Sequence, residues 1–400
     1  MAFIKKHCDP SRLVDNVFGI VARMKEDEKR LGKGNSVNCS VGSLKNEDDV
    51  LVAYKVVFDN EAKLPSTVKA AYAAGLQGNR EYLDASMDWA LKGKVNLAKD
   101  AIATSGGTGA LYLAISCLLD EGDNILLPHI GWGSYKLMAN DNHLNIVNYN
   151  VFDVDDICAK MKEASKSGKV FIVLNSPCHN PTGYSYTKAE FEKIIDCANE
   201  LSKSSEVIIL NDVAYIDYSV DYKHSRDYME AFNNISDNVL VLVAFSTSKT
   251  FSYYGERLGS LIILNKSKEV VDSLEAVFEK KARCVWSNVN NGAMVNIANV
   301  LRDHKDEYFK EREEYVSMLK KRGDLFTSEA DECGLEYYPY KEGFFVTLKI
   351  DDPAELSRIH EALLNDRIYA VKVNKGIRIA ICSTPLHDLK GLAKRIKDLY

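Results

Sequence analysis

The sequence predicts an α/β protein with a mostly parallel seven-stranded β-sheet in a large domain and a smaller α+β domain beside it. Its 400 residues exceed one compact core, so two domains are expected. In the middle of the chain, seven short apolar or β-branched runs alternate with helical patterns. Such alternation favours parallel strands with helices on both faces of the sheet. The runs cover residues 100–104, 124–128, 145–149, 170–174, 207–210, 239–245 and 258–264.

Helical patterns fill several of the gaps between these runs. Thr187 and Glu190 form a capping-box pattern at the start of one such helix. From about residue 287 to residue 325 the periodicity stays helical, which predicts a long helix that leaves the large domain. The helices predicted within the sheet region cover residues 108–119, 187–202 and 266–281.

A short α+β segment follows the long helix. We expect a helix at residues 10–31 to pack with this C-terminal segment. The predicted large domain therefore covers residues 51–325, and residues 1–50 and 326–400 form the small domain, with a ligand-binding cleft between the two. The C-terminal elements are strands at 343–350, near 369–373 and at 377–382, and helices at 353–365 and 385–399.

The composition excludes several classes of protein. A formal net charge of −6 argues against a nucleic-acid-binding surface. No apolar run is long enough to span a membrane, and the N-terminus has no apolar signal segment, so we expect a cytoplasmic protein. The nine cysteines include no Cys-x-x-Cys pair, and the eight histidines include no His-Glu-x-x-His pattern. We therefore expect free thiols and no metal site.

Lys249 is the most informative residue of the chain. It follows the apolar run 239–245 and the hydroxyl residues Ser246, Thr247 and Ser248, and Arg257 lies eight positions later. A lysine at the exit of a buried strand is costly, because burial opposes its charge. A surface lysine in a loop is the ordinary alternative. A lysine of lowered pKa is what a carbonyl cofactor needs to form an imine, and pyridoxal phosphate is the usual cofactor of this kind.

Two further motifs follow predicted strands. The segment Ser105–Ala110 contains Gly106, Gly107 and Thr108 between a strand and a helix, a form that suits phosphate binding at a helix N-terminus, although a plain turn would also explain it. It does not match a nucleotide-binding glycine pattern. Trp132 is flanked by glycines and could stack on a planar ring, or could be a core residue.

Polar residues also follow the next two strands. Asn180 belongs to an Asn-Pro-Thr-Gly turn, and Asp212 and Tyr215 follow the run 207–210. A buried carboxylate needs a cationic or hydrogen-bonding partner, and a protonated pyridine nitrogen would serve for Asp212. Each residue alone has a structural explanation. Together they place complementary groups at the carboxyl ends of neighbouring strands, the edge where open α/β sheets bind ligands.

With these motifs, the chain resembles the aspartate-aminotransferase-like (class I) branch of the fold-type I pyridoxal-phosphate enzymes. The resemblance runs from about Asn38 to Ser383. Its most specific part is Ser246-x-x-Lys249 followed by Tyr254-Gly-Glu-Arg257-Leu-Gly, supported by Asn180-Pro-Thr-Gly and Asp212-x-x-Tyr215. The family implies a fold-type I transferase, pyridoxal 5′-phosphate as cofactor and a homodimer with shared active sites.

The resemblance also implies a role for each matching residue. Lys249 would form the imine with the cofactor, Asp212 would pair with the pyridine nitrogen, and Trp132 would stack on the ring. Asn180 and Tyr215 would contact the ring hydroxyl. The phosphate would be bound by Ser246, Arg257, Gly106, Gly107 and Thr108, with Tyr82 reaching across the dimer interface to the phosphate of the neighbouring subunit.

Five residues bear on the substrate: Trp132 and Asn180, which would also contact the cofactor, and three others. By resemblance, Arg378 would clamp the substrate α-carboxylate, the backbone of Gly42 would approach the substrate, and Arg283 would bind the distal carboxylate of a dicarboxylate in the partner's site. An exposed basic patch is the alternative for Arg283. The family's aspartate enzymes often carry a histidine three positions after the stacking tryptophan, where this chain has Tyr135, which could retune the Asp212 contact.

The resemblance predicts an aminotransferase that moves an amino group from aspartate or an aromatic amino acid to a 2-oxo acid by a ping-pong route. Lys249 would carry the Cα proton. A β-lyase or decarboxylase on the same scaffold is one alternative, and a non-catalytic pyridoxal-phosphate-binding regulator is another. The sequence does not rank the amino donors.

Overall fold

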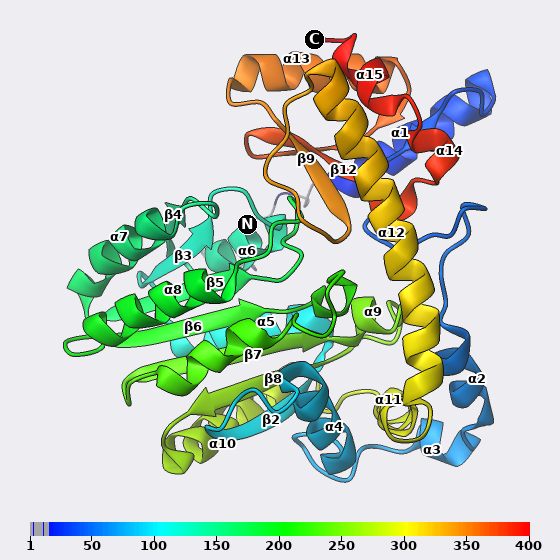
Figure 1. The fold of residues 1–400 in the computed structure, drawn as a ribbon. Coiled ribbons are helices and arrows are strands. Elements are labelled where there is room, and N and C mark those ends of the chain that lie inside the picture. The colour runs from blue at the N-terminus through cyan, green and yellow to red at the C-terminus, as the bar shows by residue number, and fades with distance from the viewer. Residues whose placement is uncertain (1–2, 4–10, 12–15) are drawn as a thin grey trace.

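A seven-stranded β-sheet forms the centre of the large lobe in the computed structural model, which describes Phe3, Ser11 and residues 16–400 (Figure 1). The strand order is β2-β8-β7-β6-β5-β3-β4, and β8 alone runs antiparallel to its neighbours. All seven predicted strands are confirmed. They are β2 (Ala98–Ser105), β3 (Asn124–Pro128), β4 (Asn145–Tyr149), β5 (Lys169–Asn175), β6 (Glu206–Asp212), β7 (Val239–Ser246) and β8 (Leu258–Asn265).

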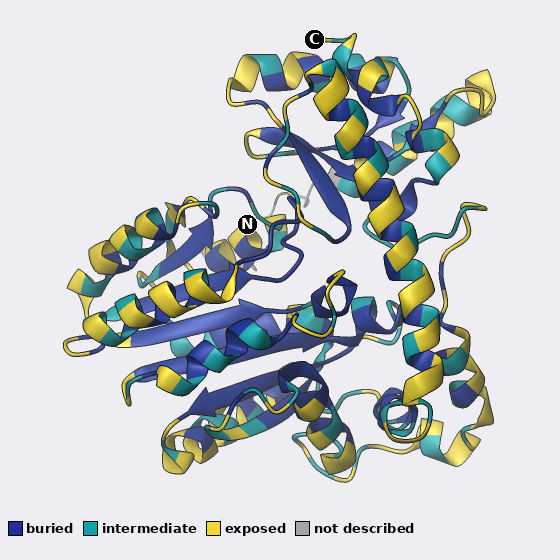
Figure 2. Cartoon of the chain, in the orientation of Figure 1, coloured by how far each residue is buried: buried dark blue, intermediate teal, exposed yellow. Residues whose placement is uncertain are grey.

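Helices cover both faces of this sheet, which explains why its central strands are apolar along nearly their whole length. Strands β7 and β8 are buried at every residue (Figure 2). The three helices predicted in this region are confirmed as α5, α8 and α10, and the Thr187–Glu190 capping box is present. One face packs against α5 (Gly106–Leu118), α6 (Gly133–Asp141) and α10 (Lys268–Val285), and the other against α4 (Arg80–Leu91), α7 (Val154–Ala164) and α8 (Lys188–Leu201).

The long helix predicted over residues 287–325 is two helices. Helix α11 (Asn291–Asp303) ends at His304, and α12 (Lys305–Cys333) continues to a left-handed cap at Gly334, whose φ is 68°. Helix α12 runs from the large lobe into the small lobe, across the predicted domain boundary at residue 325 (Figure 1). Two helices that were not predicted, α2 (Lys55–Lys63) and α3 (Ser66–Ala70), precede α4.

The small lobe combines the N-terminal helix with the C-terminal segment. As predicted, α1 (Asn16–Leu31) packs here, with Ile20 against Tyr369 and Val371; positions 10 and 12–15 of the predicted helix lie outside the described residues. The predicted helix 385–399 is interrupted at Gly391, whose φ is 76°. The remaining elements are β1 (Val37–Asn38), β9 (Phe345–Lys349), α13 (Pro353–Asn365), β10 (Ile368–Tyr369), β11 (Val371–Val373), β12 (Gly376–Ala380), α14 (Leu386–Leu389) and α15 (Leu392–Lys397).

Two small sheets hold these elements together. Strand β1 pairs with β10, and the antiparallel sheet β11-β12-β9 places β12 between two neighbours. Across the described part of the chain, no helix combines the length and the apolar character that crossing a membrane requires.

Candidate active site

A cavity of about 300 Å³ lies at the carboxyl ends of the large-lobe strands, where the sequence placed the site. Most of the predicted cofactor ligands line it together. Six further residues that the prediction had not assigned to the cavity complete its wall. The predicted residues are Gly107, Thr108, Trp132, Asn180, Asp212, Tyr215, Ser246, Lys249 and Arg257, and the additional ones are Leu111, Tyr135, Asn175, Ala214, Ser248 and Tyr254.

Lys249 lies on α9 (Thr247–Thr250), the short helix that follows β7. Its Nζ donates a hydrogen bond to the carbonyl oxygen of Gly42 at 2.9 Å. Burial lowers the pKa of Lys249 to about 8, and the positive charges of Arg378 and Arg257 act in the same direction. About a tenth of this amine is therefore neutral at pH 7, far more than for an ordinary lysine, and the neutral form is the one that can attack a carbonyl carbon.

Asp212 ends β6 and is 5% exposed. Its Oδ2 accepts a hydrogen bond from the hydroxyl of Tyr135 at 2.5 Å, and its Oδ1 accepts one from the backbone N–H of Ala214 at 3.0 Å. Burial raises the pKa of Asp212, although both hydrogen bonds oppose the shift. None of the described lysines, arginines or histidines forms an ion pair with it. The carboxylate thus has room for a cationic partner in the cavity.

Two glycines and an arginine form a cradle at the N-terminus of α5. Gly106 has a φ of 72°, and a Cβ there would lie 2.4 Å from Nη2 of Arg257. A Cβ on Gly107 would lie 3.0 Å from the Cβ of Ser246. Nη1 of Arg257 donates to Ser248 Oγ at 3.0 Å. A guanidinium, two hydroxyls and a helix N-terminus converge here, a donor set that fits a phosphate group.

Asn180 links the cavity to the small lobe. Its Nδ2 donates to the hydroxyl of Tyr215 at 3.3 Å, and its Oδ1 accepts from Nη1 of Arg378 at 3.3 Å. Nη2 of Arg378 also donates to the carbonyl of Ser40 at 2.8 Å. Arg378, on β12, lines a second cavity of about 810 Å³ between the lobes, and Trp132 and Asn180 line both cavities. The arginine thus lies beside the cavity that contains Lys249.

Trp132 directly precedes α6 and is partly buried. Its ring meets that of Tyr135 edge-on, with centroids 5.5 Å apart and an interplanar angle of 89°. Because the indole borders the cavity and is fixed by this contact, it can pack against a flat ring bound there.

Five predicted residues do not line the cavity, and two of these, Tyr82 and Arg283, do not contact its lining as Gly42, Gly106 and Arg378 do. The expectation for Tyr82 is wrong: this residue of α4 is fully buried in the core of its own chain, so it is not available to a neighbouring subunit. Tyr72, ten positions earlier, is 85% exposed and follows α3. Arg283 is exposed near the end of α10, where its Nη1 donates to Ser287 Oγ at 2.7 Å. It does not line the cavity of its own chain.

Two of the six additional residues, Asn175 and Tyr254, hold the cavity wall together through hydrogen bonds. The Oδ1 of Asn175 accepts from the backbone N–H of Asn180 at 2.8 Å, and its Nδ2 donates to the carbonyl of Asp212 at 2.9 Å. Tyr254 accepts from the backbone N–H of Leu44 at 2.9 Å, and its ring centroid lies 4.7 Å from Lys249 Nζ. Asn175 ends a buried strand, a signal that could have found it. The contact of Tyr254 with Leu44 joins positions too distant in sequence to be foreseen.

Comparison with known proteins decides the family. The sequence model of the family described as aminotransferase class I and II matches residues 37–396. The chain belongs to this family. An aminotransferase structure from Anaerococcus prevotii is 29% identical, with a TM-score of 0.95 over 100% of this chain and 99% of that chain.

More distant relatives have names that mention aromatic amino acids. The aromatic-amino-acid aminotransferase of Escherichia coli is 24% identical over 367 residues, 87% of this chain and 89% of its own length. The structure of an aromatic-amino-acid aminotransferase from Burkholderia pseudomallei, covalently bound to pyridoxal phosphate, is 22% identical, with a TM-score of 0.77 over 99% of this chain and 100% of that one. The likeness between this aminotransferase and the latter is one of fold.

The fold is that of a fold-type I pyridoxal-phosphate enzyme, and this aminotransferase uses pyridoxal 5′-phosphate to transaminate small-molecule amino acids and 2-oxo acids. The cavity fits the cofactor at four points. The cradle of Gly106 and Arg257 suits the phosphate, the neutral amine of Lys249 suits the aldehyde, and Asp212, which lacks a cationic partner among the described residues, suits a ring nitrogen that carries a proton. Trp132 suits the ring face.

Proposed function

We propose that this aminotransferase moves the amino group of aspartate or an aromatic L-amino acid to a 2-oxo acid such as 2-oxoglutarate by a ping-pong mechanism. We further propose that it works as a cytoplasmic homodimer. The observation that carries the proposal is the placement of Lys249, whose amine has a pKa lowered to about 8 and lies in one cavity with Asp212 and the Arg257 cradle.

The residues around the cofactor bind and orient it. When bound, pyridoxal phosphate supplies an aldehyde that exchanges amines and a ring that takes up the electron pair released at Cα. Asp212 would hold a proton on the ring nitrogen, and Tyr135 keeps the Asp212 carboxylate in place through its 2.5 Å hydrogen bond. Arg257, Ser246, Gly106, Gly107 and Thr108 hold the phosphate, while Asn180 and Tyr215 contact the ring hydroxyl.

The substrate is bound by Arg378 and deprotonated by Lys249. The guanidinium of Arg378 grips the α-carboxylate with two parallel hydrogen bonds, which fixes the Cα–H bond with respect to the cofactor ring. The neutral Nζ of Lys249 would act as the base that takes the Cα proton and would carry that proton while the cofactor is bound. The hydrogen bond from Lys249 Nζ to the Gly42 carbonyl supports the assignment. Gly42 lies two residues after Ser40, whose carbonyl accepts a hydrogen bond from Arg378, so the amine and the guanidinium are held by the same segment.

Changing Lys249 to Ala tests this assignment. The variant should lose transamination and the visible absorbance of the bound cofactor, because no other amine lines the cavity among the described residues. Arg257→Lys should keep the absorbance and bind the cofactor more weakly, since an ammonium cannot reproduce the guanidinium fork. Transamination retained by Lys249→Ala at the parent rate refutes the role of Lys249.

The donor preference depends on Arg283. Its exposed guanidinium supports a role in a partner's site, where it would bind the distal carboxylate of aspartate or 2-oxoglutarate. Tyr72, also exposed, replaces Tyr82 as the tyrosine that we propose to reach the neighbouring subunit's phosphate.

Arg283→Ala should lower kcat/KM for aspartate by about 10- to 100-fold, which corresponds to the loss of one hydrogen bond to a charged group. The kcat/KM for aromatic donors should stay nearly unchanged. Lys280→Ala, which removes an exposed cation from the same helix, is the matched control. Equal losses for aspartate and aromatic donors would contradict the role of Arg283. Sedimentation of the holoenzyme reports whether it is a dimer.

A further inference from the structure

A buried polar network centred on Asp217 lies outside the cavity. Asp217 is 1% exposed, and its Oδ1 accepts a hydrogen bond from Nη2 of Arg226 at 2.6 Å. Its Oδ2 accepts from Trp89 Nε1 at 2.9 Å and from Thr250 Oγ1 at 2.7 Å. Arg226 is fully buried and Thr250 is 1% exposed. Both carboxylate oxygens therefore accept hydrogen bonds from donors within the protein.

This network holds the short helix that carries Lys249. Thr250 is the next residue after Lys249, and both belong to α9, which has only four residues. The hydroxyl of Tyr218 donates to the carbonyl of Lys249 at 2.9 Å, and that of Tyr308 donates to the carbonyl of Thr250 at 2.7 Å. A helix of one turn has few hydrogen bonds of its own, so its orientation depends on such contacts.

The charge state of Asp217 fixes the direction of its hydrogen bond to Thr250. Burial raises the pKa of Asp217, but the positive charges of Arg226 and Arg312 outweigh it, and the pKa lies below the ordinary value. Nε of Arg312 also donates to the backbone carbonyl of Asp217 at 2.6 Å. An ionised carboxylate only accepts hydrogen bonds, so the Thr250 hydroxyl must donate, which selects one rotamer of Thr250.

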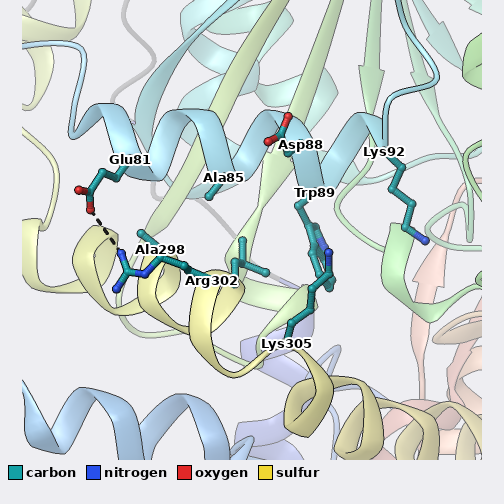
Figure 3. A pocket seen from close by; sticks show the side chains of 9 residues that line it. Glu81, Ala85, Asp88, Trp89, Lys92, Ala298, Arg302 and Lys305 are labelled. Atoms are coloured by element: carbon teal, nitrogen blue, oxygen red, sulfur yellow. Dashed lines mark ion pairs between the residues drawn. The ribbon is translucent and has the colours of Figure 1, made fainter.

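Trp89 is the member of the network nearest to the surface. It lies in the wall of a cavity of about 430 Å³ between α4 and α11 (Figure 3). Phe309 stacks on the indole with centroids 5.4 Å apart and an interplanar angle of 26°, and Nζ of Lys305 lies 5.6 Å from the ring centroid. Because these contacts hold the indole in place, its N–H is kept toward Asp217. The chain of contacts runs from this surface cavity through Trp89, Asp217 and Thr250 to Lys249.

We propose that Asp217 and Tyr218 are positioning residues for Lys249: Asp217 acts through the side chain of Thr250, and Tyr218 acts through the carbonyl of Lys249 itself. Together they hold α9 so that Nζ stays buried between the Tyr254 ring, the Gly42 carbonyl and the cofactor. The inference rests on the function proposed for Lys249. Removing either anchor loosens α9, which lets water reach Nζ and moves it away from the substrate Cα.

Thr250→Val tests the Asp217 anchor, because it keeps the shape of the side chain and removes the hydroxyl. The full-length enzyme, carrying the amino form of its cofactor so that Lys249 is free, is labelled with an amine-acylating reagent between pH 6 and pH 11. Mass spectrometry of the Lys249 peptide then gives the midpoint of labelling. The titratable and charged groups that face Nζ are unchanged in this variant; they are Cys382, Arg378, Arg257, Tyr215 and Tyr254.

We expect Thr250→Val to raise the labelling midpoint by about one pH unit, because a better hydrated amine holds its proton more strongly. It should also lower kcat about tenfold and leave KM within about twofold, since proton transfer is affected more than substrate binding. Thr250→Ser, which restores the hydroxyl, should return both values to those of the parent enzyme. Thr327→Val, which removes a hydroxyl that donates to the Gly323 carbonyl at 2.8 Å on α12, should change neither.

A Thr250→Val enzyme with the parent midpoint and kcat, but with a lower melting temperature, would overturn the inference in favour of a purely structural network. If that variant does not fold, Tyr218→Phe is measured in the same way, and an unchanged midpoint there overturns it equally. The labelling midpoint does not require turnover, so the two proposals are tested separately. The Thr250→Val result can overturn the positioning role of Asp217 while Lys249→Ala still establishes the role of the lysine. Conversely, Lys249→Ala can refute the role of the lysine while the labelling midpoint still shows the effect of the anchor.

Discussion

Asp212 and Asp217 lie five positions apart, and both are buried carboxylates, yet the protein compensates them differently. Asp217 is paired with Arg226 at 2.6 Å, and its pKa is lowered despite burial. Asp212 has hydrogen bonds from Tyr135 and Ala214 but no ion pair among the described residues, and burial raises its pKa. A buried acid that lacks a cation marks a place where a ligand can supply one. A buried acid with its own arginine marks a structural anchor.

The largest effect that we expect from this contrast is on stability. Asp217→Asn should lower the free energy of unfolding by about 3–5 kcal/mol at neutral pH, because it leaves Arg226 buried without a counter-charge. Urea denaturation of the full-length chain measures it. Because the folded-state pKa of Asp217 is lowered, its contribution is complete above the unfolded pKa near 3.8 and is lost as the pH falls through the folded value. An unchanged free energy of unfolding would show that the ion pair contributes nothing.

Asp212→Asn should lower the activity strongly and leave the stability of the protein unchanged or higher, the opposite of Asp217→Asn. We expect kcat to fall by about 10²- to 10³-fold, because the variant no longer stabilises a proton on the cofactor ring. The cofactor-free chain should be as stable as the parent or more so, since the substitution removes a buried charge that has no cationic partner there. Steady-state kinetics and urea denaturation of the same preparation give both numbers. A loss of stability as large as that of Asp217→Asn would erase the proposed distinction between the two acids.

Tyr135→Phe should have the smallest of these effects. The Tyr135 hydrogen bond lowers the pKa of Asp212, so its removal raises that pKa further and leaves less of the carboxylate ionised at a given pH. The acidic limb of the kcat–pH profile should move to higher pH, and kcat at neutral pH should fall by up to about tenfold.

Tyr149→Phe is the matched control for Tyr135→Phe. The Tyr149 hydroxyl is buried and donates to the carbonyl of Val173 at 2.6 Å, rather than to Asp212. Its removal should leave the acidic limb in place. If both variants shift the limb equally, the effect comes from packing and not from the bond to Asp212.

The seven large-lobe strands and the location of the site could be predicted, because both depend on local patterns. Strands buried on both faces are continuous apolar runs, and polar residues at their carboxyl ends must meet at one edge. Lys249, Asp212 and Asn180 were found in this way, and the structure places all three in one cavity.

Other features depend on contacts between distant positions, which a single sequence does not reveal. Tyr82 lies on a helix whose inward face packs into the core, whereas Tyr72 lies beyond the end of α3 and is exposed. The role of Asp217 follows from Arg226, Trp89 and Thr250, which the fold brings together from three separate segments. The break between α11 and α12 at His304 was not predicted either, because the helical pattern of the sequence continues through it without interruption.

Borohydride reduction of the holoenzyme tests whether Lys249 bonds covalently to the cofactor. Reduction fixes the imine, and peptide mass spectrometry then locates the added pyridoxyl phosphate group. We expect a single modified peptide with the group on Lys249 and loss of transamination in proportion to the modification. A group found on another lysine, or an active enzyme in which Lys249 stays unmodified, would contradict it.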